Sequence, residues 1–298
     1  DNMGLVIENV SKTFVDKKAV DDISFRIEKP GVFALLGTNG AGKTTTIRMM
    51  LGILKKDTGT ILWNGKSVDR KNVNFGYLPE ERGIYPKTRI VDQLEYFAKL
   101  KGMSKQEAQK NIDYWLDKLK MTEYKYQTAE KLSKGNQQKI QFITAVMHNP
   151  ELIVLDEPFS GLDPVNTELL KNIILELVKE DKYIVMSSHQ MNSVEEFCED
   201  VVILNKGKTV LKGNLNEIKD SYPVKKIEID TKVDITKILQ DNKLEIKNKE
   251  GRKYIISINN QEQAQTLLND LVRNDIVIEK FELLKPTLHE IFIEKVGE

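Results

Sequence analysis

The chain has 298 residues, 40% of them hydrophobic and 30% charged, and its 45 basic residues balance its 45 acidic ones. This composition supports a folded core and excludes a fully disordered or collagen-like chain. Because nucleic-acid binders are usually basic, the neutral charge disfavours that class, and we expect no nucleic-acid partner. The one cysteine, Cys198, cannot form an internal disulfide, so a reducing compartment such as the cytoplasm is favoured.

Apolar patterning predicts alternating strands and helices through the first two-thirds of the chain. Strands are expected at Val20–Ile27, Val32–Leu36, Ile61–Trp63, Asn74–Leu78, Glu151–Leu155, Tyr183–Ser187 and Val201–Leu204. Helices are expected at Thr46–Leu54, twice between Val91 and Leu119, and at Gln137–His148, Asn166–Lys179 and Val194–Glu199. Such alternation predicts an α/β domain with a largely parallel sheet. No apolar run approaches the roughly 20 residues of a spanning helix, so a membrane role requires a partner.

The pattern changes after Gly213. The order becomes strand, helix, hairpin, helix, strand, helix, at Lys225–Asp230, Ile235–Gln240, Leu244–Lys247 with Tyr254–Ile258, Gln261–Arg273, Val277–Leu284 and Thr287–Val296. We therefore expect a small α+β accessory domain over residues 222–298, for which a ferredoxin-like arrangement is one solution.

A glycine-rich segment follows the apolar run Val32–Leu36. It fits the phosphate-loop pattern G-x-x-x-x-G-K-[ST] with Gly37, Thr38, Asn39, Gly40, Ala41, Gly42, Lys43 and Thr44, and Thr45 adds a further donor. Glycines let backbone N–H groups converge on a phosphate chain, and the positive end of the next helix favours the anion. Lys43 supplies a charge for the phosphates, and Thr44 a hydroxyl ligand for Mg²⁺.

Two acids end a second buried strand. Asp156 and Glu157 follow Leu152–Leu155, at the strand end where open α/β sheets bind ligands. Asp156 is a candidate Mg²⁺ ligand, and Glu157 is placed to polarise a water beside the terminal phosphate. The two motifs together predict ATP and Mg²⁺ as ligands.

Between the two motifs stands Leu132-Ser133-Lys134-Gly135-Asn136, and with it the chain resembles the ATP-binding subunits of ABC transporters. The resemblance covers residues 4–213 and implies a P-loop ABC-type fold, a mixed sheet with a helical subdomain at about 82–149. It implies that Ser133, Lys134, Gly135, Asn136 and Asp163 contact the ATP of a second copy. It further implies that His189 contacts the terminal phosphate and that Phe14 stacks on adenine.

Two departures from the family pattern stand out. The loop that usually carries a glutamine has Glu80, which still offers a carboxylate to Mg²⁺ or water but adds negative charge near ATP. Lys134 and Asn136 replace the usual glycine and glutamine of the signature.

The segments YLPEERG and PTLHEIFIEKVG resemble a narrower branch, the ATPase subunits of ABC-2-type exporters, similar to the sodium-extrusion system. This implies an ATPase that dimerises on ATP and powers export through an integral membrane permease, as a peripheral protein on the cytoplasmic face of the membrane. Neither the transported substrate nor the permease is specified by the sequence.

Two alternatives stay open. A soluble ABC-type ATPase could act on ribosomes or DNA, although one phosphate loop, a short insert and a neutral charge disfavour it. A non-hydrolysing ATP-dependent regulator is the other, against which Lys43, Asp156, Glu157 and His189 all argue.

Overall fold

The computed structural model describes residues 4–69, 74–81 and 83–297, and the chain forms two compact units, residues 1–213 and 214–298. The first unit has two sheets and the second has one, and each unit has a hydrophobic core of its own. Among the described residues, no helix combines the length and the apolar character that crossing a membrane requires.

The first unit contains an antiparallel sheet in the order β2-β1-β4-β5. Its strands are β1 (Leu5–Phe14), β2 (Lys17–Ile27), β4 (Thr58–Trp63) and β5 (Lys66–Ser67). Strand β1 was not expected from the sequence, because only its first three residues form an apolar run. Its register against β2 shifts between Ile7 and Val10, where Asn9 has a φ of 51°, and this breaks the simple alternation.

The second sheet of this unit has the order β10-β9-β3-β8-β7-β6. Its strands are β3 (Gly31–Gly37), β6 (Phe75–Leu78), β7 (Leu152–Asp156), β8 (Tyr183–Ser188), β9 (Asp200–Asn205) and β10 (Lys208–Asn214). From β9 to β6 all neighbours pair in parallel, so β3, β7 and β8 end at the same edge. The predicted α/β fold class is confirmed, although β10 was not foreseen.

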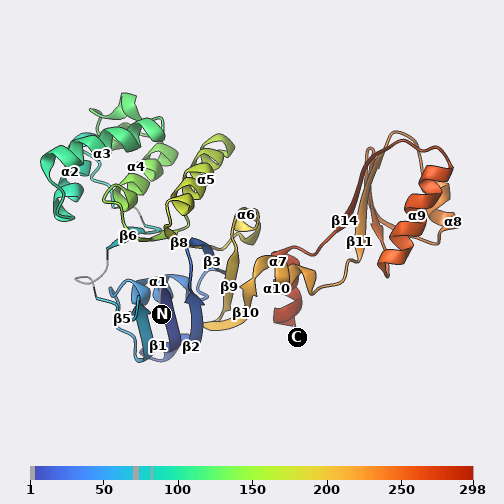
Figure 1. Ribbon diagram of the computed structural model, residues 1–298, viewed down its shortest axis with the longest axis horizontal. Helices are drawn as coiled ribbons and strands as arrows, with labels where there is room; N and C mark the ends of the chain where they lie inside the picture. The colour runs from blue at the N-terminus through green and yellow to red at the C-terminus, as the bar shows by residue number, and fades with distance from the viewer. Residues whose placement is uncertain (1–3, 70–73, 82, 298) are drawn as a thin grey trace. The chain divides into compact units, whose positions relative to one another are not determined.

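The helices cover the parallel sheet. They are α1 (Lys43–Met50), α2 (Ile90–Leu100), α3 (Lys105–Lys118), α4 (Lys134–Val146), α5 (Pro164–Lys179) and α6 (Met191–Val194), with 3₁₀ turns at Thr122–Tyr124 and Ala129–Lys131. Figure 1 shows α2 to α5 on one side of the sheet and α1 with the antiparallel sheet on the other. The core on the α1 side joins both sheets through Ile7, Ile23, Leu35, Ile47 and Val154.

Two helix predictions need correction. The helix expected at Val194–Glu199 is wrong, since α6 is a single turn that ends at Val194 and the following residues form turns. The helix expected at Thr46–Leu54 begins earlier, at Lys43, and ends at Met50, because the left-handed backbone of Gly42 caps its start.

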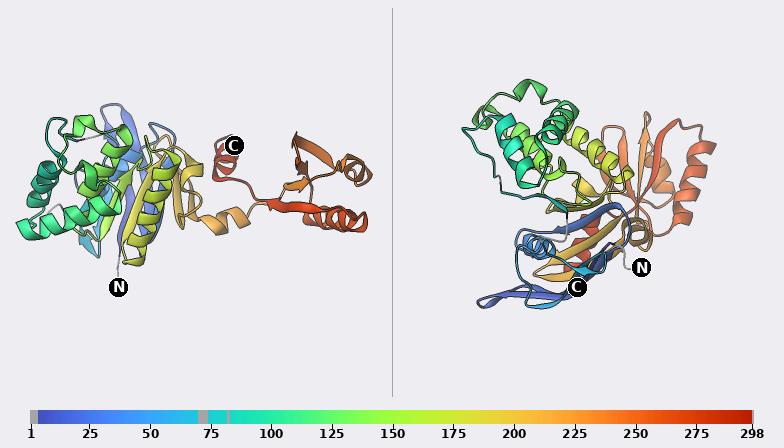
Figure 2. Two further views of the ribbon diagram at one scale, coloured as in Figure 1. Left: turned by 90° about the horizontal axis from the view of Figure 1, so that it is seen from above. Right: turned by 60° about the vertical axis from the view of Figure 1, so that its left-hand side comes forward.

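The second unit has an antiparallel sheet in the order β12-β13-β11-β14. Its elements are α7 (Leu215–Asp220), β11 (Lys226–Thr231), α8 (Thr236–Asp241), β12 (Glu245–Glu250), β13 (Lys253–Ser257), α9 (Gln261–Arg273), β14 (Ile278–Leu284) and α10 (Leu288–Gly297). From β11 to β14 this is the ferredoxin-like βαββαβ connectivity. Helices α8 and α9 cover one face and close the core, as Figure 2 shows.

Candidate functional site

The phosphate loop connects the buried strand β3 to α1. Gly40 and Gly42 have φ angles of +81° and +105°, in the left-handed region where glycine is least strained. A Cβ on Gly42 would stand 2.7 Å from the Ala19 carbonyl oxygen, whereas one on Gly40 would meet nothing within 4 Å. The loop therefore needs glycine at residue 42 for both space and conformation, and at residue 40 for conformation alone.

Lys43 is the first residue of α1 and is only 7% exposed. Its Nζ donates to the carbonyl oxygens of Gly37, at 2.5 Å, and Thr38, at 3.0 Å, within its own loop. Burial lowers the pKa of Lys43, and the negative charges of Glu157, Asp156 and Glu80 oppose that shift. The ammonium thus lies among three carboxylates without a direct ion pair to any of them among the described contacts.

Asp156 ends β7 and is 1% exposed. It accepts hydrogen bonds from the Ser187 hydroxyl on β8 and, at 3.2 Å, from the Thr44 hydroxyl on α1. Burial raises the pKa of the Asp156 carboxyl, and both hydrogen bonds oppose that rise. A carboxylate and a hydroxyl oxygen held side by side are suitable ligands for Mg²⁺.

The described residues contain no group of three or more acids, histidines or cysteines arranged around a metal position. Mg²⁺ is commonly held by one or two protein ligands together with water and substrate phosphates. The Thr44–Asp156 pair therefore fits a metal that binds together with a nucleotide.

Glu157 follows β7 with a backbone φ of +52°. Its Oε1 accepts a hydrogen bond from the backbone N–H of His189 at 2.7 Å and lies 2.6 Å from His189 Nδ1. The Ser188 hydroxyl lies 3.4 Å from the other carboxylate oxygen. The end of β8 thus fixes this carboxylate from two sides, and the exposed imidazole lies beside it.

Lys43, Thr44 and Glu157 border one pocket of about 260 Å³, whose lining does not include Asp156 or His189. The pocket is lined by Phe14, Lys17, Ala19, Asn39, Gly40, Gly42, Lys43, Thr44, Thr45, Glu80 and Glu157. Phe14 is 44% exposed, an apolar ring open to contact with a flat ligand, and the Lys12 ammonium lies 5.5 Å from its centroid. Burial, then the charges of Asp156 and Glu157, raise the pKa of Glu80.

The signature residues and Asp163 occupy a different place and do not line this pocket. Ser133 caps α4 by accepting from the Asn136 backbone N–H at 3.1 Å, and Asp163 caps α5 by accepting from Asn166 N–H at 2.8 Å. Gly135 lies against the loop before α5, since a Cβ there would stand 3.2 Å from the Gly161 carbonyl oxygen. Both caps are structural roles that the sequence motifs did not reveal.

Sequence reasoning also missed residues that build the site. Lys17 and Ala19 line the pocket, and Ser187, Ser188 and Gln138 hold the strand-end acids or the backbone beside them. The serines could have been found by the rule that located Asp156, since they end the neighbouring parallel strand. No local signal marks Ala19 or Gln138.

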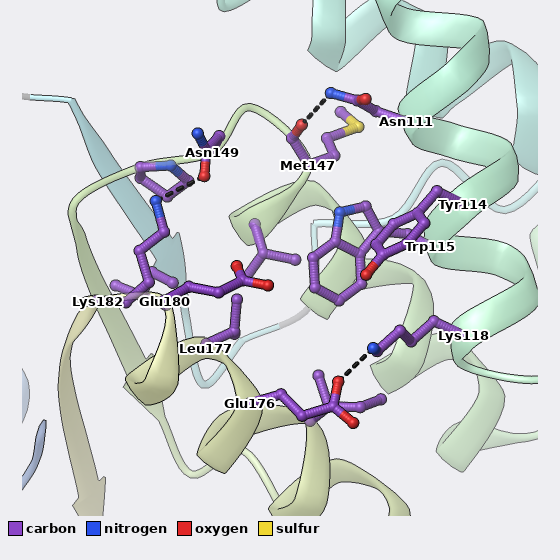
Figure 3. Close-up of a pocket in the computed structure, with 14 residues that line it drawn as sticks. Asn111, Tyr114, Trp115, Lys118, Met147, Asn149, Glu176, Leu177, Glu180 and Lys182 are labelled. Carbon is purple, nitrogen blue, oxygen red and sulfur yellow. Dashed lines mark hydrogen bonds and ion pairs between the residues drawn. The ribbon is translucent and has the colours of Figure 1, made fainter.

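A second pocket, of about 310 Å³, lies between α3, α5 and the end of α4 (Figure 3). Lys118 forms an ion pair with Glu176 across it, and Lys182 Nζ donates to Asn149 Oδ1 at 2.6 Å. The Asn111 side chain donates to the Met147 carbonyl oxygen at 2.8 Å. Its lining includes Ile153 of the second motif but none of the candidate site residues among those that the structure describes.

The parallel sheet, the phosphate loop and the strand-end acids define a P-loop nucleotide-binding protein. Residues 20–160 match the family described as ABC transporter, and residues 213–296 match the C-terminal domain of the ATP-binding protein DrrA1-3-like family. The chain is 50% identical over 295 residues to the ABC transporter ATP-binding protein YhaQ of Bacillus subtilis, covering 98% of each protein. It therefore belongs to the ATP-binding subunits of ABC transporters, as predicted.

Other relatives support the same family membership. The ABC transporter ATP-binding protein MJ1023 of Methanocaldococcus jannaschii is 52% identical over 212 residues, covering 71% of this chain and 78% of that protein. A solved ATP-binding subunit of an ABC transporter superposes with a TM-score of 0.68 at 28% identity, over 74% of this chain and 93% of that one. Membership of this family implies that the protein binds and hydrolyses ATP and works with a membrane permease.

Proposed function

We propose that the chain hydrolyses MgATP in the pocket lined by Lys43, Glu80 and Glu157, and that two copies use this reaction to drive export through an integral membrane permease. The observation that carries the proposal is that one pocket unites the phosphate loop with the catalytic carboxylate while the signature lies outside it.

Phosphate binding falls to the backbone of residues 37–42, to Lys43 and to the hydroxyls of Thr44 and Thr45. Phe14 stacks on adenine. Thr44 and Asp156, with Glu80 nearby, would hold Mg²⁺, which would neutralise phosphate charge. Glu157 orients the attacking water and accepts its proton, and His189, beside Glu157 Oε1, contacts the terminal phosphate.

The proposal of a dimer is supported by the position of the signature residues, which do not line the pocket of their own chain. The signature residues lie apart from the pocket of their own chain, so Ser133, Lys134, Gly135, Asn136 and Asp163 are free to face the pocket of a second copy. The positive end of α4, which begins at the signature, suits a phosphate. ATP would then lie between two copies and hold them closed until hydrolysis.

Export is proposed from the relatives. The ATP-binding protein LptB of a lipopolysaccharide export system in Haemophilus influenzae is 28% identical over 230 residues, covering 75% of this chain. A protein of this kind acts on the cytoplasmic face of the membrane, attached through its permease. Within the chain, residues 4–213 form the ATP-binding domain with a helical subdomain at about 82–149, and residues 222–298 form the accessory domain.

The test is MgATP turnover by the wild type and by Glu157→Gln. The amide keeps the shape of the side chain but cannot accept the proton, so turnover should fall by roughly 10²-fold or more while ATP binding persists. This variant should accumulate as an ATP-bound dimer in light scattering. A wild type that binds ATP without hydrolysis would favour a regulator, and co-purification with ribosomes instead of membranes would favour a soluble ATPase.

A further inference from the structure

The backbone at Glu157 needs support. Its φ of +52° is uncommon for a residue with a side chain and costs on the order of 1 kcal/mol. The Glu157 N–H donates to the Ser187 carbonyl oxygen at 3.1 Å, and the Ser160 N–H donates to the Glu157 carbonyl oxygen at 3.2 Å. These bonds tie the segment to β8 and to its own turn, and neither involves a helix.

Helix α4 provides a further support for the backbone at Glu157. Gln138, which is 3% exposed, donates through Nε2 to the carbonyl oxygens of Pro158 at 3.0 Å and Glu157 at 3.4 Å. Both neighbours are carbonyl oxygens, which only accept, so the NH₂ end of the amide must face them. A single buried side chain thus bridges the backbone of the catalytic glutamate and of the residue after it.

The same helix contacts the loop a second time. A Cβ added to Gly135 would stand 3.2 Å from the Gly161 carbonyl oxygen, so the first turn of α4 packs closely on the far end of the segment 157–162. Gln138 lies one turn further along α4 from Gly135. Helix α4, which Ser133 caps, therefore contacts both ends of the segment that starts with Glu157.

We propose that Gln138 is a positioning residue for Glu157. Its two donated hydrogen bonds hold the left-handed backbone that directs the carboxylate toward His189 and the pocket. Since Gln138 and the signature share α4, the same bonds tie the position of the catalytic carboxylate to the helix whose start faces the second copy. This inference rests on the proposed hydrolysis at Glu157.

The test replaces Gln138 with methionine, which keeps the volume and removes the donors. Turnover at saturating MgATP should fall about tenfold, with KM for ATP within about twofold of wild type. The matched control is Gln141→Met, on the next turn of the same helix, 7% exposed and with an unpartnered side-chain oxygen. That control should keep kcat within about twofold, because no hydrogen bond to the catalytic segment is lost.

Two further measurements separate positioning from damage to the fold. Thermal unfolding checks that both methionine variants are folded, and Gln138→Asn, whose amide is one carbon too short to reach, replaces Gln138→Met if that variant unfolds. In a Glu157→Gln background, Gln138→Met should cause no further loss of the residual turnover, because its effect acts through the carboxylate.

An unchanged kcat in a folded Gln138 variant, an equal loss in Gln141→Met, or additive losses with Glu157→Gln would each overturn the inference. A wild type without MgATP hydrolysis would instead reject the proposed function, so the two failures are distinguishable.

Discussion

Two pockets of the first unit are similar in size but differ in how their charged side chains are paired. In the pocket of about 310 Å³, the charged side chain of Lys118 is paired with Glu176, and Lys182 has an amide partner in Asn149. In the pocket of about 260 Å³, Lys43 is surrounded by three carboxylates yet bonds to its own loop. Volume alone does not single out the proposed ATP site, because pockets of about 710 and 430 Å³ also occur in the first unit. The pocket of the proposed ATP site is distinguished by charged groups that lie close together without forming ion pairs to Lys43.

The substitution Lys43→Ala gives the strongest test of this difference between the two pockets. The variant loses charge-assisted contacts to phosphate, so MgATP turnover should disappear and nucleotide affinity should fall by roughly 10- to 100-fold. Steady-state turnover and titration with a fluorescent nucleotide measure the two effects. Wild-type turnover in this variant would show that the phosphate loop has been misassigned.

A smaller effect is expected from Glu80→Gln. Burial and the neighbouring acids Asp156 and Glu157 raise the pKa of Glu80, which indicates that its charge is unfavourable in this pocket. Removing it should change turnover several-fold and tighten ATP binding by at most about fivefold, since the site is open to solvent.

The same variant should also respond differently to the permease, if the loop of Glu80 reaches the docking surface. Turnover with and without the permease, alongside ATP affinity, decides the matter. If neither turnover nor its stimulation changes, the replacement of the usual glutamine is neutral.

The second pocket supplies a contrasting variant, Lys118→Met. It removes the ion pair with Glu176, which is partly exposed, so the free energy of unfolding should fall by about 0.2–1 kcal/mol. Nucleotide affinity and turnover should stay at wild-type values. A loss of turnover comparable to that of Lys43→Ala would mean that the paired pocket also serves catalysis.

Both pockets are lined only by residues of the first unit. Deleting residues 222–298 should therefore leave a folded protein with unchanged ATP affinity, because the second unit closes a core of its own. Circular dichroism and nucleotide titration test this expectation. A folded core that has lost ATP binding would show that the boundary or the role of the second unit is misplaced.

Sequence reasoning succeeded where the signal is local. Short sequence patterns identify the segments Gly37–Thr44 and Leu152–Glu157. Because parallel strands end at one edge of the sheet, these patterns also predict that Thr44 and Asp156 lie close together. It failed at β1, where a register shift interrupts the alternation, and at α6, where one turn leaves no periodicity.

The side chains that hold the site residues in place could not be predicted from the sequence, for a different reason. Gln138 contacts Pro158 across 20 residues, and Ser187 contacts Asp156 across 31. Whether a buried glutamine bonds to a distant carbonyl or lies unpartnered, as the Gln141 oxygen does, depends on how the helix is placed on the sheet. That placement is a property of the packed structure and leaves no local pattern.

The carbonyl group of Ala19 on β2 lies against the phosphate loop, which bears on the rate of nucleotide binding. A Cβ on Gly42 or on Gly207, in the turn after β9, would stand 2.7 Å from the Ala19 carbonyl oxygen, and the Gly207 N–H donates to the Ala41 carbonyl oxygen at 2.9 Å. The phosphate loop is thus held in place by contacts within the chain, from β2 and from the turn after β9. A preformed loop has little conformational entropy to lose when a nucleotide binds. The nucleotide should therefore associate quickly, without a slow rearrangement of the loop. The slow events of the cycle would then be the separation of the two copies and the departure of products.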